Sequence, residues 1–270
     1  MSGLTLSIDV SGLPIRVQGI PAELRESLED AWAGFVVPPM PDPILDVFVE
    51  EGTKRLTPGR VMVGGISVKR ERGVVSFVRD EAEGSLDLAE GSAKVALSVG
   101  DDKRRAWGLV NLVHAALAWS LASRGGGIVH AAGIVVEGRA FLLIGAEGAG
   151  KSTFAHVAAS AGLPVVGDDQ VVVLRTGGRL EALGAPVRNR EHVNAPKGRW
   201  PVAAFLLPRH GEKAAVAPAS RLDLLPRLTA NLVYNLFEEE GLLDTIADGV
   251  PAHWLTFAPD PSFVPLLRAL

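Results

Sequence analysis

The sequence has no cysteine among its 270 residues, a single tyrosine, and no marked excess of charge of either sign. Without cysteine the chain has no disulfide, no thiolate nucleophile and no thiolate metal site, which fits a reducing compartment. Its 27 basic and 31 acidic residues leave a net charge of -4, too weak a field to gather nucleic acid or an anionic membrane. The first residues also lack the basic and apolar segments of a secretion signal. We therefore expect a cytoplasmic protein with no nucleic-acid partner and no membrane partner.

One apolar stretch, residues 106–122, is near the lower length limit for crossing a bilayer. Charged residues precede it, and Arg124-Gly125-Gly126-Gly127 follows it, which is typical of a helix that ends at a glycine. We interpret this stretch as a buried core helix rather than a membrane span, and we predict no transmembrane segment.

The hydrophobic fraction of 47% is enough for one large domain or two modest ones. Short alternating runs up to about residue 100 predict a small α+β unit over residues 1–102, with the boundary placed at a cluster of charges. Apolar runs at residues 128–136 and 140–144 then predict a hairpin, followed by a helix and a short strand. This order predicts an α/β core with a mixed sheet over residues 103–270.

A glycine-rich octet stands between the second strand of this hairpin and the next helix. Its residues are Gly145-Ala146-Glu147-Gly148-Ala149-Gly150-Lys151-Ser152, which match GxxxxGK[ST] in full, and Thr153 follows. Glycines allow the tight turn that aims backbone N–H groups and a helix N-terminus at phosphate oxygens. Lys151 would add a positive charge at the β- and γ-phosphates, and the Ser152 hydroxyl would bind Mg²⁺. The octet therefore predicts a binding site for ATP and Mg²⁺; the alternative is a glycine-rich turn with a solvated lysine.

Two adjacent aspartates, Asp168 and Asp169, come 17 residues after Lys151, a gap that holds one helix and one short strand. Parallel strands share their carboxyl ends at one sheet edge, so the aspartates are expected to face the phosphates. One carboxylate would hold Mg²⁺ and the other would accept the proton of an attacking hydroxyl. A polar strand end without catalytic function is the alternative.

The hairpin also predicts the place of His130. If Val136 pairs with Arg139 across the turn, then His130 lies opposite Gly145 and borders the phosphate loop. A lone histidine in an apolar strand is as often a hydrogen-bonded core residue, so spacing alone leaves its role open.

Three elements together resemble the catalytic core of HPr kinase/phosphorylase and related serine kinases, a core similar to the nucleotide site of phosphoenolpyruvate carboxykinase. They are the run from His130 to Gly133, the glycine-rich loop, and Gly167-Asp168-Asp169. The resemblance implies that Asp168 is the base toward a serine hydroxyl, that Asp169 and Ser152 serve Mg²⁺, and that His130 supports Asp168. It also implies a peptide or small-protein acceptor and assembly into homo-oligomers.

The chain departs from this family at Thr153, where the family has glutamate. The resemblance therefore implies neither phosphorylase activity nor the family's own protein substrate. Arg188, Arg190 and Arg209 follow the aspartates in stretches that read as loops. Any of them could stabilise the transferring phosphoryl group, although surface solvation is the commoner role of such residues.

Two functions follow from these patterns. The first is a kinase that transfers the ATP γ-phosphoryl group to a hydroxyl, serine in a peptide or small protein, with a small-molecule hydroxyl as a variant; Asp168, His130 and Lys151 would be its catalytic residues. The second is a nucleotide-dependent regulatory or binding module with little or no catalysis, in which the motif-free residues 1–102 bind the partner.

Overall fold

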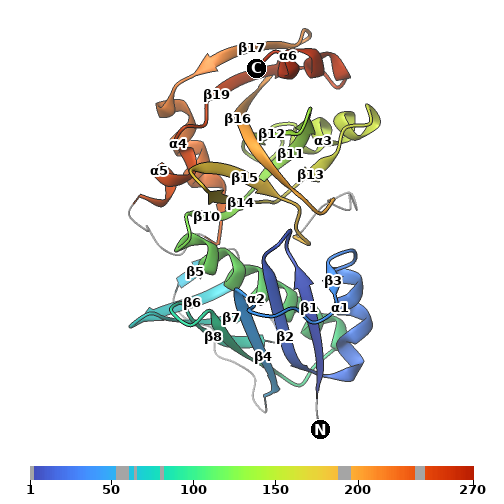
Figure 1. Cartoon of the computed structure of the whole chain (residues 1–270), viewed down its shortest axis with the longest axis vertical. Helices are drawn as coiled ribbons and strands as arrows, with labels where there is room; N and C mark the ends of the chain where they lie inside the picture. Colours follow the sequence, from blue (N-terminus) through green and yellow to red (C-terminus); the bar gives the residue numbers. More distant parts are fainter. Residues whose placement is uncertain (1–2, 53–60, 64–65, 80–81, 188–195, 235–240) are drawn as a thin grey trace. The chain divides into compact units, whose positions relative to one another are not determined.

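The computed structural model describes residues 3–52, 61–63, 66–79, 82–187, 196–234 and 241–270. It is a mixed α/β chain that divides into two compact units, Met1–Leu121 with Tyr234–Phe237, and Ala122–Val233 with Glu238–Leu270 (Figure 1). The division falls at residues 121–122 rather than at the predicted residues 102–103. The reason is helix α2 (Asp102–Ala122), which belongs by its contacts to the first unit.

Among its described residues, the first unit comprises a sheet, two helices and a short 3-10 turn. Its described strands run in the order β3-β1-β2-β4-β9-β8-β7-β6-β5. Their bounds are β1 Leu4–Asp9, β2 Pro14–Ile20, β3 Val36–Val37, β4 Leu45–Glu51, β5 Val61–Val63, β6 Ile66–Glu71, β7 Val74–Arg79, β8 Ala82–Asp87 and β9 Ser92–Leu97, with η1 at Ala22–Leu24 and α1 at Arg25–Ala31. Strands alternate buried and exposed residues, as expected where one face of a sheet is packed and the other solvated.

Helix α2 packs on the buried face of this sheet. The ring of Trp119 lies 5.3 Å from that of Phe77 on β7, and Gly108 lies against Ala82 on β8 so closely that a Cβ there would come within 3.3 Å of it. In the described part of the chain, no helix combines the length and the apolar character needed to cross a membrane. The apolar stretch is thus a core helix, as predicted, and it begins at Asp102 rather than Ala106.

The second unit is built on a larger mixed sheet with the described order β13-β11-β12-β16-β15-β14-β10-β18, and β19 and β17 extend it from β16. Its strands are β10 Gly126–Val129, β11 Ala131–Val136, β12 Arg139–Ile144, β13 Val165–Gly167, β14 Val171–Thr176, β15 Arg179–Leu183, β16 Arg199–His210, β17 Ala215–Ala219, β18 Leu232–Val233 and β19 Ala252–Phe257. Its helices are α3 Lys151–Ser160, α4 Arg221–Asn231, α5 Leu242–Ala247, η2 Pro261–Phe263 and α6 Val264–Arg268.

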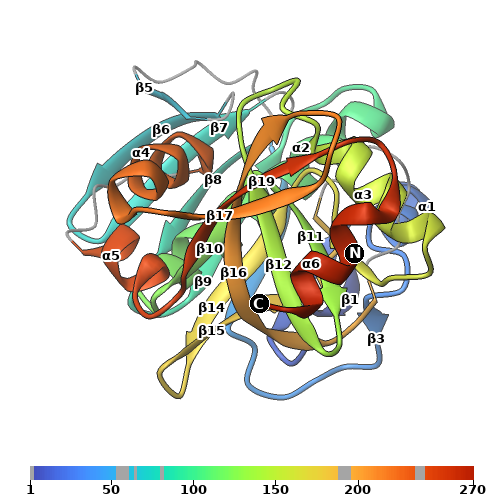
Figure 2. The same ribbon diagram turned by 90° about the horizontal axis from the view of Figure 1, so that it is seen from above.

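Helices cover both faces of this second sheet. Figure 2 shows α3 and α6 on one side of β11, β12 and β16, and α4 and α5 on the other. Each side has its own apolar core: Phe154 of α3 and Leu267 of α6 belong to one, and Leu228 of α4 and Ile246 of α5 belong to the other. Strands β12, β16 and β19 are mutually parallel, so their carboxyl ends meet at one edge of the sheet.

Candidate phosphate-binding site

The glycine-rich loop leaves the carboxyl end of β12 and leads directly into α3, in the order that the sequence predicted. Gly148 and Gly150 have φ angles of +76° and +92°, in the left-handed region where glycine alone is unstrained. Gly150 is the N-cap of α3. The chain turns at this residue, and the first N–H groups of the helix therefore point toward the loop. This strand, loop and helix form a frame suited to an anion.

Hydrogen bonds hold the side chain of Lys151 against the first residues of this loop. Its side chain is buried, and Nζ donates hydrogen bonds to the carbonyl oxygens of Gly145 at 2.7 Å and Ala146 at 3.0 Å. A buried ammonium group is tolerated only where acceptors or anions surround it. The loop therefore holds a positive charge at the mouth of the helix, where oxyanions would lie.

Phenylalanine side chains pack against one another beside the loop. Phe154 of α3 packs against Phe257 of β19 and Phe263, with ring centroids 5.8 Å and 4.9 Å apart. The Phe257 ring also touches the backbone at Gly150, since a Cβ there would come within 3.2 Å of it. These ring contacts oppose displacement of the backbone at the end of the loop.

The aspartate pair lies at the same sheet edge as the loop. Strands β12 and β13 are both antiparallel to β11, which runs between them, so β12 and β13 point the same way. Asp168 and Asp169 follow the end of β13 and are 2% and 8% exposed. The predicted shared edge is confirmed, with β11 as an intervening strand.

His130 contacts Asp169, whereas the family resemblance implied support of Asp168. Its Nε2 lies 3.2 Å from Oδ1 of Asp169. The chain turns sharply after β13. Gly167 lies so close to the carbonyl of Gln170 that a Cβ on Gly167 would come within 2.2 Å of that oxygen. This turn brings the second aspartate, rather than the first, back toward the start of β11.

His130 also interrupts what the sequence indicated was one strand over residues 128–136. Strand β10 ends at Val129 and β11 begins at Ala131. Between them the backbone N–H of His130 donates to the carbonyl of Asn231, at the end of α4, at 2.7 Å. No sequence pattern pointed to Asn231, because the contact joins segments about a hundred residues apart.

The remaining predicted residues take different places. Ser152 is half-buried in the first turn of α3, whereas Thr153 and Glu147 are exposed. Arg188 and Arg190 lie outside the described residues. Arg209, predicted to be in a loop, lies instead in β16, whose carboxyl end runs beside the loop.

The site has few protein ligands for a metal. Across the described ranges, no group of three or more histidine, aspartate or glutamate side chains could hold a metal ion by itself. Asp169 and Ser152 could contribute one carboxylate and one hydroxyl oxygen. Mg²⁺ takes six oxygen ligands and is commonly completed by phosphates and water, so an ion held here would need ligands beyond these two residues.

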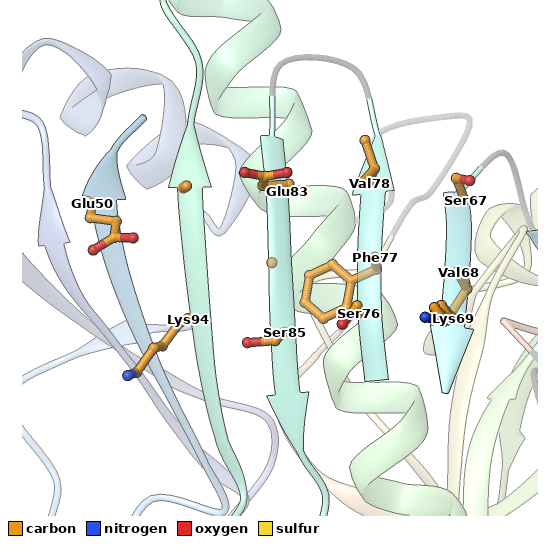
Figure 3. Close-up of a pocket in the computed structure, with 12 residues that line it drawn as sticks. Glu50, Ser67, Val68, Lys69, Ser76, Phe77, Val78, Glu83, Ser85 and Lys94 are labelled. Atoms are coloured by element: carbon orange, nitrogen blue, oxygen red, sulfur yellow. The ribbon is translucent and has the colours of Figure 1, made fainter. Parts of the chain in front are cut away.

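A groove of about 430 Å³ lies elsewhere, on the first unit (Figure 3). Lys94, Glu83 and Ser85 are among its lining residues, which come from β4 and β6 to β9, on the polar face of the first sheet. None of the predicted site residues lines it. Mixed charges on the open face of a sheet are the ordinary composition of a solvated surface, so we assign no chemistry to this groove.

Comparison with known proteins adds little to this geometry. No protein-family model matches the chain, and no curated protein matches it. One matching solved structure is the HPr(Ser) kinase/phosphatase from Coxiella burnetii, at 13% sequence identity, covering 52% of this chain and 90% of that one, with a TM-score of 0.30. A TM-score this low carries no functional argument.

Proposed function

We propose that the second unit binds ATP with Mg²⁺ and transfers the γ-phosphoryl group to a hydroxyl, that of a serine in a peptide or small protein. One observation carries this proposal: the glycine-rich loop with its buried Lys151 and the buried pair Asp168 and Asp169 lie at one edge of one sheet.

The site fits these ligands in chemical terms. Two adjacent carboxylates buried at a sheet edge lose most of their hydration, which is unfavourable unless donors or cations compensate. The His130 imidazole is one such group for Asp169. A divalent cation would be a second, and the loop amides with Lys151 would receive the phosphates that accompany it.

Bound ATP would supply the phosphoryl group, and Mg²⁺ would neutralise charge on its oxygens. Asp169 and Ser152 would hold the metal, and His130 would fix the orientation of Asp169, as partners of ligating carboxylates do. Asp168 would accept the proton of the attacking hydroxyl. The hydroxyl oxygen forms the new bond to phosphorus as the bond to the β,γ-bridging oxygen breaks, and Lys151 and the loop amides stabilise the resulting charge.

The test is transfer from γ-labelled ATP to peptides encoded beside the gene, together with equilibrium binding of ATP. We expect Asp168→Asn to bind ATP within about threefold of the wild type and to lose roughly 10²- to 10⁴-fold in transfer, the usual contribution of a general base. Lys151→Ala should weaken ATP binding and transfer together. Asp248→Asn, which changes an exposed aspartate, is the matched control.

The two functions give different outcomes. Undiminished transfer in Asp168→Asn would remove the base assignment. ATP binding without a labelled acceptor would favour the nucleotide-dependent binding module instead of the kinase. Preference for adenine over guanine nucleotides can be measured in the same assay.

A further inference from the structure

Two arginines stack on one tryptophan beside the phosphate loop. The guanidinium carbon of Arg209 lies 3.9 Å from the centroid of the Trp254 ring, and that of Arg227 lies 4.8 Å from the same centroid. Arg209 comes from β16, Trp254 from β19 and Arg227 from α4, so three separate elements build the cluster. Cation–π contacts of this kind hold a guanidinium group flat and restrict its rotation.

The cluster has an excess of positive charge. Arg227 donates from Nη1 to the backbone carbonyl of Asp223 at 2.8 Å, and neither arginine forms an ion pair with a carboxylate among the residues that the structure describes. Asp223 is the acidic residue that both arginines influence, but its carboxylate caps α4 by accepting hydrogen bonds from Ser220. These hydrogen bonds, together with the charges of Arg227 and Arg209, hold the pKa of Asp223 below its usual value.

Two cations held against one ring repel each other, and an oxyanion bound close to them would relieve this repulsion. Arg209 is exposed and Arg227 half-buried, so the guanidinium edges can be reached from solvent. Planar N–H donors suit carboxylate and phosphate oxygens, which they can bind in a bidentate manner.

The position of the cluster indicates which oxyanion reaches it. Pro208, the neighbour of Arg209, lies against the first loop residue, since a Cβ on Gly145 would come within 2.7 Å of it. The cluster is therefore next to the proposed site. It lies, however, on the sheet face that α4 covers, whereas the loop continues into α3 on the opposite face. A nucleotide held by the loop and the N-terminus of α3 would occupy the α3 side, which leaves the cluster to the acceptor.

We propose that Arg209 and Arg227, stacked on Trp254, bind an acidic side chain of the peptide acceptor and so select acidic substrates. This inference rests on the proposed kinase function. At the sheet edge, β13, which leads to Asp168, is three strands from β16, which carries Arg209. That separation is on the order of 14 Å, and an extended peptide advances about 3.3 Å per residue. The acidic residue therefore lies about four residues from the reactive serine.

The test uses short peptides with one serine and one glutamate placed one to six residues from it, each paired with a glutamine peptide of the same length. Binding to the full-length protein with Mg²⁺ and a non-hydrolysable ATP analogue is measured by calorimetry. We expect the glutamate peptide to bind at least fivefold more tightly than its glutamine partner, with the largest ratio near a spacing of four. Arg209→Gln should remove this preference, and Arg209→Glu should transfer it to a lysine peptide.

Arg179→Gln is the matched control, because Arg179 is an exposed arginine at the turn of the β14–β15 hairpin. This turn joins the ends of β14 and β15 that lie away from His130. It should keep the wild-type preference.

Equal binding of glutamate and glutamine peptides at every spacing, or a glutamate preference that survives Arg209→Glu, would overturn the proposal. So would a fall in ATP affinity in Arg209→Gln with the peptide preference intact, since the cluster would then serve the nucleotide. A preserved acidic preference without any phosphoryl transfer would refute the kinase and leave this binding site standing.

Discussion

Gly150 is the residue whose backbone conformation the loop depends on most. Its φ of +92° is unfavourable for any residue with a Cβ, and a Cβ there would also crowd the Phe257 ring at 3.2 Å. A left-handed conformation costs a non-glycine residue roughly 1–2 kcal/mol. We expect Gly150→Ala to lower the free energy of unfolding by more than this amount and to weaken ATP binding about tenfold, because the loop and ring must shift.

The matched control for this substitution is at the other end of the same helix. Gly162 has a φ of +78°, but nothing lies within 4 Å of a Cβ built on it. Gly162→Ala should therefore show the backbone cost alone, about 1–2 kcal/mol in urea denaturation, with unchanged ATP affinity in calorimetry. If both variants bound ATP like the wild type, the Gly150 conformation would have no part in phosphate binding.

At the scale of the element, the sequence determined the β11–β12 hairpin and its register. Val136 pairs with Arg139 and Ala131 with Ile144, as predicted, because Glu137 and Gly138 form a tight turn with positive φ angles of 49° and 75°. Local turn chemistry sets such a register without help from the rest of the chain. The glycine-rich loop and α3 were predictable for the same reason.

Elements that depend on distant partners were not predictable. The break at His130 arises because β10 pairs with β14 and β18 while β11 pairs with β12 and β13, and no local pattern encodes that change of partners. Strand β8 carries little strand signal of its own, because its sequence, AEGSLD, is low in β-branched residues, and it forms through pairing with β7 and β9. The pairing of His130 with Asp169 depends on a turn that is only visible in three dimensions.

In the first unit, an ion pair between β2 and β4 makes stability depend on pH. Arg16 Nε donates to Asp46 Oδ1 at 3.1 Å, with a shorter contact between Nη2 and Oδ2, and Gln18 Nε2 donates at 2.8 Å. Burial by itself raises the pKa of Asp46, but these hydrogen bonds and the charge of Arg16 outweigh it and hold the pKa below its usual value. The pair therefore stabilises the fold above the unfolded-state pKa of about 3.9, and this contribution is lost as the pH falls through the lower folded-state pKa.

We expect Asp46→Asn to reduce the free energy of unfolding by about 1–2 kcal/mol at pH 7. This value is smaller than that expected for a fully buried charged hydrogen bond, because Arg16 is partly exposed to solvent. The difference from the wild type should shrink as the pH is lowered from 6 toward 3, in urea denaturation followed by circular dichroism. Asp30→Asn, which changes an exposed aspartate of α1, is the control. A difference that did not vary with pH would show that Asp46 acts through packing rather than charge.

At the scale of the whole molecule, the chain divides into two compact units, and the residues of the proposed nucleotide site all belong to the second. A ligand that binds only the folded form stabilises it by RT ln(1 + [L]/Kd), which is about 2.7 kcal/mol at 100 times Kd.

We expect saturating ATP with Mg²⁺ to slow amide hydrogen exchange about 100-fold in the slowest-exchanging amides of β12, α3 and β13. Those of β7 and β8 should be unchanged, because their unit contains none of the proposed ligands. Lys151→Ala should abolish the effect in the second unit. An equal slowing in β7 and β8 would instead mean that nucleotide binding couples both units, and the first unit would then be part of the nucleotide response.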